Sequence, residues 1–500
     1  MKKILVLIFI GFSFNVAQSQ EIKDAVQYSQ DNLNGTARFR AMGGAFGALG
    51  GDLSSLNINP AGSSIFSNNQ ITISLSNFNK KNDSNYFGTS TSESNNNFDM
   101  NQLGGVFVFK NQNPSSSWKK FSLAINYDNT NDFDNSIFSA GTNPTRSLSN
   151  YFVSYANGVP LNVLQNSRYG QLDNGGQQAF LGYQAYVINP VNDVPTNTNY
   201  TSNVTPGGNY YQENSIYSSG YNGKLSFNAS TSFEDKFYIG ANLNSHFTDY
   251  VGSTSFYESN NNPLGIDHTV TNMRFDNKLH TIGTGFSFQI GAIAKVTKEI
   301  RLGLSYDSPT WYILNDEFSQ SLVAVSSNTA GDLAPDVVDP QIINYYDPYK
   351  LTTPGKVTGS FAYIFGKTGL LSLDYSLKDY ANTKFEPKND PYYRSLNSKM
   401  SNTLTSSGEL RLGAEYKIKA WSLRGGYRFE ESPYKDTTTI GDLNSFSGGL
   451  GYNFGAFKLD FSYSNGQRNS QQSFFSQGFT DAAQIKTSNN NVTMTMTFEL

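Results

Sequence analysis

The stretch that decides the fold lies near the carboxyl end, Val492-Thr493-Met494-Thr495-Met496-Thr497-Phe498. Apolar residues alternate strictly with threonine, so one face is apolar and the other polar, which is the period of a half-buried β-strand. The same alternation runs from Leu371 to Leu377, from Trp421 to Phe429 and from Phe457 to Tyr463, whereas helical periodicity is scarce. The sequence therefore predicts an all-β protein.

Fourteen such strands can be placed along the chain, an even number, as expected for a bacterial single-chain barrel. They cover roughly residues 70–79, 101–110, 119–129, 221–233, 236–249, 280–296, 299–308, 354–365, 369–379, 407–418, 420–430, 443–454, 456–466 and 489–499. A barrel strand exposes every second residue to lipid, so a membrane barrel is compatible with the low mean hydropathy of −0.45.

The connections between these strands alternate in length after the first hairpin. Short links fall around 234–235, 297–299, 366–368, 417–420 and 453–456, and long segments cover about 129–220, 250–279, 309–353, 380–406, 431–442 and 467–488. Transmembrane barrels have short periplasmic turns and long outer loops. The pattern therefore predicts a 14-stranded antiparallel transmembrane β-barrel in the outer membrane, with both termini of the mature chain on the periplasmic side.

The amino terminus reads as an export signal. Lys2 and Lys3 precede an apolar stretch from Ile4 to Phe14, and Ala17-Gln18-Ser19 offers small residues for cleavage. We expect a signal peptide at 1–19, an N-terminal plug or hatch at 20–68, and the barrel with its long outer loops at 69–500. The chain has no cysteine and a net charge of −4, which argues against a disulfide framework, a cysteine-based metal or catalytic site, and nucleic acid as a partner.

The expected hatch is rich in small residues, which can pack tightly inside a barrel wall. It contains Gly43-Gly44, Asp52, which could cap a short helix through Ser54 and Ser55, and Asn59-Pro60-Ala61-Gly62 just before the first strand. Proline fixes its own φ and biases the preceding residue away from helix, so Asn59-Pro60 predicts a turn. A fourteen-stranded lumen is wide enough to need such a plug.

At these residues the chain resembles the FadL/TodX family of outer-membrane transporters for long-chain fatty acids and aromatic hydrocarbons. The resemblance is carried by Ala41-Met42-Gly43-Gly44-Ala45, by Asp52 and above all by Asn59-Pro60-Ala61-Gly62. Further family-like motifs are Ser308-Pro309-Thr310-Trp311-Tyr312, Thr353-Pro354-Gly355-Lys356-Val357, Leu373-Asp374-Tyr375, and Leu423-Arg424-Gly425-Gly426-Tyr427 with Ser432-Pro433.

The resemblance implies a monomeric barrel with a hatch, through which apolar ligands diffuse, and an exit through a kinked third strand. Here that strand, Phe121 to Asn129, contains neither glycine nor proline, so the sequence does not predict a kink.

Candidate chemistry is sparse, and we expect no enzyme activity, no catalytic residues, no metal and no cofactor. His268 falls in a loop, His280 begins a strand and His246 faces the lumen, where it is the one inward candidate for a haem-receptor role. Arg424 and Arg428 lie two inward positions apart and could bind a carboxylate head group. Inward charges of this kind also form cross-strand ion pairs, which is the favoured interpretation.

The sequence as a whole favours passive uptake of small hydrophobic molecules, captured by aromatic loop residues and passed through an apolar lumen pocket when the hatch moves. Other expected partners are outer-membrane lipid and the outer-membrane assembly machinery. A surface receptor or adhesin barrel, whose long loops bind a ligand without transport, and a general polar porin remain as alternatives.

Overall fold

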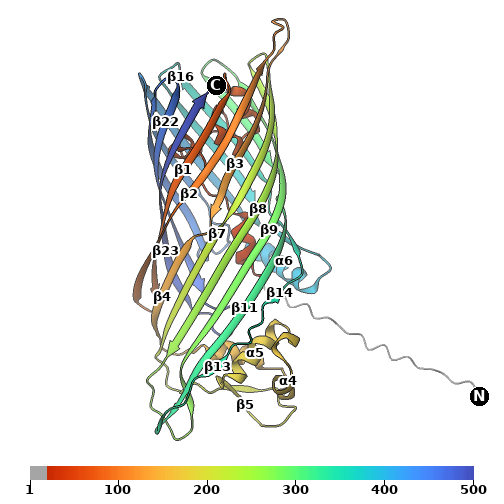
Figure 1. Ribbon diagram of the computed structural model, residues 1–500, viewed down its shortest axis with the longest axis vertical. Coiled ribbons are helices and arrows are strands. Elements are labelled where there is room, and N and C mark those ends of the chain that lie inside the picture. The colour runs from red at the N-terminus through yellow and green to blue at the C-terminus, as the bar shows by residue number, and fades with distance from the viewer. Residues whose placement is uncertain (1–19) are drawn as a thin grey trace, which may run out of the picture.

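The computed structural model describes residues 20–500, and the expected signal peptide lies outside them. The chain forms a closed antiparallel barrel of fourteen strands whose lumen contains the amino-terminal segment (Figure 1). This confirms the all-β fold class and the number of strands.

The elements follow the chain in a simple order. The hatch contains α1 (Ile22–Ser29), α2 (Ala37–Ala41), η1 (Leu53–Asn57) and η2 (Pro60–Ile65). The first part of the barrel contains β1 (Gln70–Tyr86), β2 (Thr89–Lys110), β3 (Trp118–Asp132), β4 (Asn135–Asn143), β7 (Tyr210–Phe233), β8 (Phe237–Ser259), β9 (Thr269–Lys295), β10 (Ile300–Asp307) and β11 (Trp311–Asn328). The second part contains β15 (Tyr349–Thr352), β16 (Lys356–Phe365), β17 (Gly369–Asp379), β19 (Ser406–Ile418), β20 (Trp421–Glu430), β21 (Ile440–Asn453), β22 (Phe457–Ser473) and β23 (Ala482–Glu499).

The outer segments carry the remaining elements. Between β4 and β7 lie α3 (Ser149–Ala156), α4 (Leu161–Asn166), η3 (Tyr169–Gln171), α5 (Asn174–Gln184), β5 (Ile188–Pro190) and β6 (Tyr200–Ser202). Between β11 and β19 lie β12 (Gly331–Asp332), β13 (Asp336–Val338), β14 (Asn344–Tyr345), η4 (Tyr380–Asn382), β18 (Lys384–Glu386) and α6 (Pro391–Thr403).

The barrel closes between its first and last strands. β1 pairs with β23 from Gln70 opposite Glu499 to Asn85 opposite Gln484, so neither strand is left as an edge. Closure satisfies backbone groups that lipid cannot satisfy. Two strand positions are interrupted: β3 continues as β4, and β10 continues as β11.

Outward-facing positions on the wall are large and apolar, as a lipid-facing surface requires. They include Leu123, Phe227, Leu243, Ile290, Leu304, Leu373, Leu423 and Phe461, all exposed. No helix in residues 20–500 combines the length and the apolar composition needed to span a bilayer.

Several strands are longer than the sequence predicts, because their outer parts lack apolar alternation. β2 begins at Thr89 rather than near 101, β7 at Tyr210 rather than near 221, and β9 at Thr269 rather than near 280. These added residues are rich in Asn, Ser and Tyr. A strand above the membrane need not present an apolar face to lipid, so the periodicity that revealed the membrane part is missing there.

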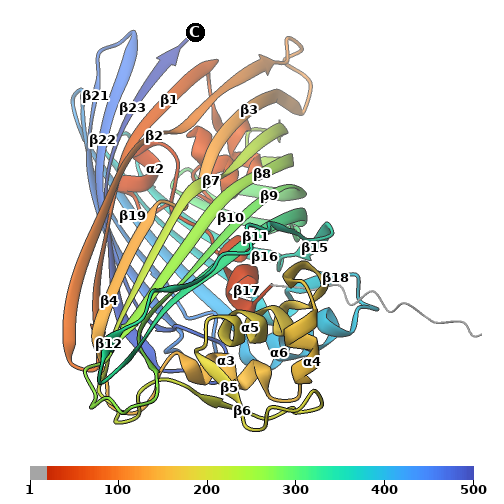
Figure 2. The same ribbon diagram turned by 60° about the horizontal axis from the view of Figure 1, so that its bottom comes forward.

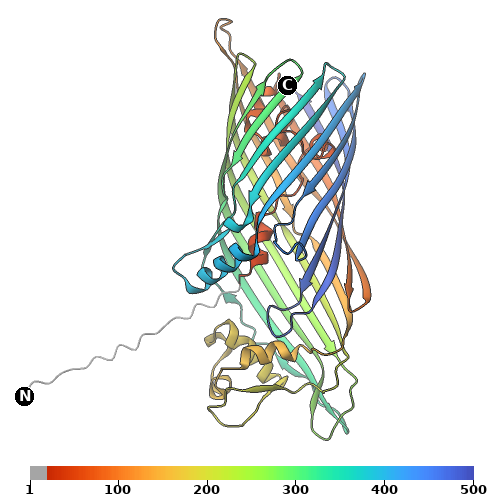
Figure 3. The same ribbon diagram turned by 180° about the vertical axis from the view of Figure 1, so that it is seen from behind.

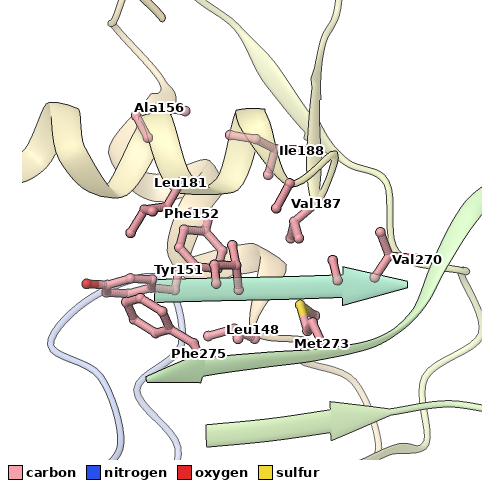
Figure 4. Close-up of a cluster of buried hydrophobic side chains, with 14 of the residues drawn as sticks. Leu148, Tyr151, Phe152, Ala156, Leu181, Val187, Ile188, Val270, Met273 and Phe275 are labelled. Atoms are coloured by element: carbon pink, nitrogen blue, oxygen red, sulfur yellow. The ribbon is translucent and has the colours of Figure 1, made fainter. Parts of the chain in front are cut away.

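Residues 144–209 form a compact helical unit, the outer subdomain, at the long-loop end of the barrel. Its helices α3 and α5 pack against the inner sides of β9 and β11 (Figure 2). Figure 4 shows the shared core, in which Phe152 and Leu181 of the outer subdomain meet Met273 and Phe275 of β9. Much of the segment expected as a loop at 129–220 is thus folded.

The two ends of the described chain lie at different levels of the barrel. The Leu500 amide donates to Asn69 O at the short-turn end, whereas Gln20 donates to Asp316, midway along the strand position of β10 and β11, and accepts from Tyr392 of α6 in a long outer segment. Figure 3 shows α1 in red beside α6 in cyan. The expectation that the amino-terminal segment starts at the short-turn end is therefore wrong. The apolar face of α1, with Val26 among its buried residues, packs with the aromatic cluster at the outer end.

Candidate functional site

Two short capped helices, α2 and η1, fold the middle of the hatch back on itself. Asp52 accepts hydrogen bonds from the Ser54 amide at 2.9 Å and from Thr36 Oγ1 at 2.8 Å, so it caps η1 and joins it to the start of α2. The cap expected through Ser54 is present, and Ser55 Oγ donates instead to the Asp52 carbonyl oxygen. Gly43 and Gly44 end α2 with positive φ values of 61° and 78°, a backbone that glycine adopts freely.

The Asn59-Pro60-Ala61-Gly62 turn attaches the hatch to the wall. Asn59 Nδ2 donates to Gly47 O at 2.8 Å and to Ala292 O of β9 at 3.0 Å, and Asn59 Oδ1 accepts from the Ala61 amide at 3.1 Å. Pro60 O accepts from Asn228 Nδ2 at 2.9 Å. One amide side chain thus caps η2, closes the hatch on itself and binds it to the barrel.

Glycines in the wall make room for the hatch. A Cβ added to Gly291 would lie 2.1 Å from Asn59 Oδ1, and one added to Gly426 would lie 2.2 Å from the Gly43 nitrogen. The same close approach of the hatch occurs at Gly240, Gly303, Gly413 and Gly449. Among these glycines, only Gly426 lies in a motif noted in the sequence, and its contact with the hatch was not predicted. The usable signal was glycine inside an otherwise regular strand, which marks a close backbone approach.

Carboxylates of the wall hold the hatch on the opposite side. Asp374 of β17 accepts from the amides of Phe46 at 2.9 Å and Gly47 at 3.0 Å. Glu415 of β19 forms an ion pair with Arg38 at 2.8 Å. Buried polar contacts therefore bind the hatch to several strands around the barrel. Such contacts hold the hatch in one defined position in the lumen.

The hatch divides the lumen into separate cavities. A cavity of about 300 Å³ lies at the short-turn end, between Arg38, Asp52 and turn residues such as Lys419. On the other side lie a central cavity of about 130 Å³, which reaches His246 and Tyr312, and a larger side cavity of about 390 Å³. Residues 30–34 line both outer cavities. Their lining mixes charged, amide and apolar groups, in contrast to the apolar lumen pocket expected from sequence.

Residues 30–34, which we call the strap, are held in place by a charged cluster. Asp31 Oδ2 lies 2.9 Å from Lys356 Nζ and 3.3 Å from Lys378 Nζ, and Arg428 donates to the Asp31 carbonyl oxygen at 2.8 Å. Burial favours the neutral form of Asp31, but the two lysines outweigh it and hold the pKa of this carboxyl well below its usual range. The strap is therefore clamped by an ionised aspartate at neutral pH.

The two arginines proposed for a ligand head group already contact carboxylates. Arg424 lies 2.7 Å from Glu415 and also pairs with Asp460, and Arg428 lies 2.6 Å from Glu430 and also pairs with Glu409. The pairs with Glu415, Asp460 and Glu409 are the cross-strand ion pairs of the favoured interpretation, and Glu430 lies on the same strand as Arg428. Binding of a ligand head group by Arg424 or Arg428 stays a prediction, which these ion pairs disfavour.

The histidines occupy three separate places. His246 faces the lumen, with Nε2 2.9 Å from Ser287 Oγ, and His280 lies 2.9 Å from Asp249. His268 lies in the loop before β9. Residues 20–500 contain no cluster of three or more His, Asp or Glu side chains suited to a metal ion.

The third strand breaks, contrary to the expectation from its lack of glycine and proline. β3 ends at Asp132, whose Oδ1 accepts from the Asp134 amide at 2.9 Å, and the Phe133 amide donates to Gly220 O of the neighbouring β7. Gly220 has a φ of 112° and also donates to Asp134 Oδ1. The kink thus depends on an aspartate turn and on a glycine in the next strand.

Beyond this break the wall is incompletely paired. Within the described chain, the backbone ladder between β2 and the third strand is confined to Gln102–Lys110, while residues 89–101 of β2 pair with β1. β4 instead contacts both strands of the first hairpin through side chains: Asn82 Nδ2 of β1 donates to Ser136 O at 2.8 Å, and Thr91 Oγ1 of β2 donates to Phe138 O. We call the unpaired stretch between residues 89–101 and residues 133–143 the third-strand break. The larger outer cavity reaches it at Asn95 and Ile137.

Similar solved structures have little sequence identity to this chain. A Pseudomonas aeruginosa FadL homologue is 12% identical with a TM-score of 0.55, over 94% of this chain and 99% of that one. The Pseudomonas putida toluene transporter TodX is 13% identical with a TM-score of 0.48, over 94% and 100%. The Ralstonia pickettii toluene transporter TbuX is 14% identical with a TM-score of 0.46, over 94% and 99%. No curated protein sequence matches the chain.

The family comparison rests on sequence and covers more than half of the chain. The profile described as outer membrane protein transport protein (OMPP1/FadL/TodX) matches residues 185–500. It confirms the resemblance noted in the sequence, the outer-membrane location and a transport role instead of an enzymatic one. The plugged fourteen-stranded barrel described above agrees with this match. The chain belongs to the OMPP1/FadL/TodX family of outer-membrane transport proteins.

Proposed function

We propose that this protein, acting as a monomer, takes up small hydrophobic molecules by passive diffusion, with long-chain fatty acids or aromatic hydrocarbons as the substrate classes. The observation that carries the proposal is the hatch, which separates the cavity at the short-turn end from the two outer cavities. A plug bound by buried polar contacts suits stepwise passage of single molecules better than a continuous water channel. Transfer of apolar area from water supplies about 25 cal/mol per Å².

Discrimination among such substrates is expected to be loose. One methylene changes the free energy of transfer by only about 0.8 kcal/mol, so chain length alone selects weakly. Selectivity beyond that has to come from the polar groups that line the outer cavities.

Two exit routes fit the geometry, and a pair of engineered disulfides distinguishes them. A molecule could leave sideways at the third-strand break or move past a displaced hatch. The hydroxyls of Ser63 in the hatch and Ser230 in β7 are in hydrogen-bond contact, and Asn97 Nδ2 of β2 lies 3.2 Å from Asp132 Oδ2 across the break. The chain has no cysteine, so paired Ser63→Cys/Ser230→Cys or Asn97→Cys/Asp132→Cys variants carry only the introduced thiols.

Uptake of labelled substrate into proteoliposomes is measured with each pair oxidised and reduced. The second pair is bridged with a short thiol-reactive linker if it does not oxidise. A lateral exit predicts loss of uptake when the third-strand break is closed and little change when the hatch is fixed; a hatch route predicts the reverse. A matched control is Thr358→Cys/Ser376→Cys, whose hydroxyls lie 2.8 Å apart across the β16–β17 pair and away from both routes. Unchanged uptake with each lock closed would contradict both exit routes, and uptake no greater than that of empty liposomes would contradict the proposed transport.

The folded outer subdomain keeps the receptor or adhesin alternative open. Asn143 and Tyr210 pair directly, so residues 144–209 can be removed and the hairpin closed with a short turn. A transporter keeps uptake after this excision, whereas an adhesin loses its binding activity. The porin alternative is tested by ion conductance in planar bilayers, which a plugged barrel should lack.

A further inference from the structure

Arg40 of α2 is a buried cation without an acidic partner. Its side chain is 1% exposed, and no carboxylate of residues 20–500 lies within ion-pair distance. Its polar neighbours are neutral and distant, Asn34 Oδ1 at 3.3 Å and Ser464 Oγ at 3.4 Å, and its Nε has no acceptor. Asn491 offers an amide oxygen at 3.0 Å when its side chain is turned. Burial lowers the pKa of Arg40 to about 10, so the group is still charged at neutral pH.

The other cations around the larger outer cavity are compensated. Arg428 and Arg468 both contact Glu430, at 2.6 Å and 3.2 Å. Lys80 donates to the carbonyl oxygens of Asp132 and Asp134, whose carboxylates lie near it. A buried charge normally has a paired counter-charge, because its desolvation is otherwise uncompensated. Arg40 departs from that rule.

Arg40 lines the larger outer cavity together with an apolar surface. The cavity volume of about 390 Å³ is within the range of small-molecule sites, about 300–1,000 Å³. Its apolar lining includes Leu33, Phe78 and Leu443, and the Arg40 guanidinium lies 5.4 Å from the centre of the Phe78 ring. The cavity therefore offers one unpaired charge beside an apolar stretch of a wall that otherwise carries compensated charges and amides, and it extends to the third-strand break.

We propose that Arg40 binds the carboxylate of an amphiphilic acid, whose apolar tail lies along Phe78 and Leu443. This inference rests on the proposed transport and names its substrate class: an anionic amphiphile in preference to a neutral hydrocarbon. The free Nε and the two weakly bonded terminal nitrogens of Arg40 match the two oxygens of a carboxylate, which guanidinium binds through parallel hydrogen bonds. The cation belongs to the hatch itself, so a bound head group contacts the element that blocks the lumen.

The test compares dodecanoate with dodecanol, which share the tail and differ in the head group. Binding of each labelled ligand to the full-length protein in nanodiscs is measured at pH 8, with empty nanodiscs subtracted. We expect the wild-type protein to bind dodecanoate about 10-fold to 100-fold more tightly than dodecanol, the usual effect of charge-assisted hydrogen bonds. Arg40→Gln should remove this preference and leave dodecanol binding unchanged, and Arg40→Lys should retain part of it.

Arg168→Gln is the matched control, because Arg168 is exposed on the outer subdomain. Folding of each variant is checked by its heat-modifiable migration in gels; if Arg40→Gln does not fold, Arg40→Lys and the wild-type comparison still decide. Equal binding of the two ligands by the wild-type protein, or an unchanged preference in folded Arg40→Gln, would overturn the inference while leaving transport intact. If neither ligand binds above empty nanodiscs, the proposed function fails together with it.

Discussion

The attachment of the hatch through Asn59 can be tested by a single substitution. Asn59→Ala removes three hydrogen bonds, to Gly47 O, to Ala292 O and from the Ala61 amide, at a residue that is 1% exposed. At a net value of about 1 kcal/mol for each bond, the closed hatch loses about 3 kcal/mol relative to a displaced one. Since 1.4 kcal/mol corresponds to a factor of ten, the displaced population should rise about 100-fold.

Hydrogen exchange measures this population directly, because amides in the hatch exchange when it opens locally. In nanodiscs, peptides covering residues 42–66 should exchange about 100-fold faster in Asn59→Ala than in the wild-type protein. Peptides from the barrel wall should not change. Asn389→Ala, at an exposed loop position, is the control. An acceleration of less than about threefold in the hatch peptides, which corresponds to under 1 kcal/mol, would refute the assignment of Asn59 as a main attachment.

Two further perturbations follow from the contacts of the hatch. Gly426→Ala places a Cβ 2.2 Å from the Gly43 nitrogen and should destabilise the folded barrel by about 1–3 kcal/mol, as overpacking does. Gly425→Ala meets nothing within 4 Å and should leave the midpoint of heat-induced gel migration unchanged; equal shifts in both variants would contradict the close approach. The folded protein lowers the pKa of Asp31, so its ion pairs with Lys356 and Lys378 contribute fully above the pKa of a free aspartate, about 3.9. Their contribution is lost as the pH falls below that value. Exchange of residues 30–34 should therefore rise only below about pH 4 in the wild-type protein but already at pH 7 in Asp31→Asn, and identical pH profiles would exclude the clamp.

The membrane part of the fold was predictable because lipid imposes a period of two on every strand it touches. The alternation from Trp421 to Phe429 and from Val492 to Phe498 reports contact with lipid directly. Above the membrane that constraint ends, and strands such as residues 89–101 of β2 were missed. The helices of residues 144–209 were missed for a related reason. Their apolar residues face a core shared with distant strands, so the local sequence shows no clear helical periodicity.

The candidate site was predictable where a residue acts on its own neighbours and not where it acts across the lumen. Asp52 caps the helix that follows it, and local sequence was enough to expect this. The third-strand break could not be read from its own residues, since Gly220 of the next strand accommodates it. The unpaired state of Arg40 was not predicted, because the sequence does not show which side chains face one another across the lumen.

The β1–β23 seam, paired from Gln70 to Asn85, has a consequence for the order of assembly. The hatch runs from Gln20, beside Asp316 midway along the strand position of β10 and β11, to Asn69 at the short-turn rim, so the finished ring encloses it. Because sixteen paired positions close the seam, a late entry of this segment has to pass end first through the mouth beside Asn69. Assembly therefore has two possible orders: the ring closes around residues 20–69, or these residues enter the closed ring from the short-turn end.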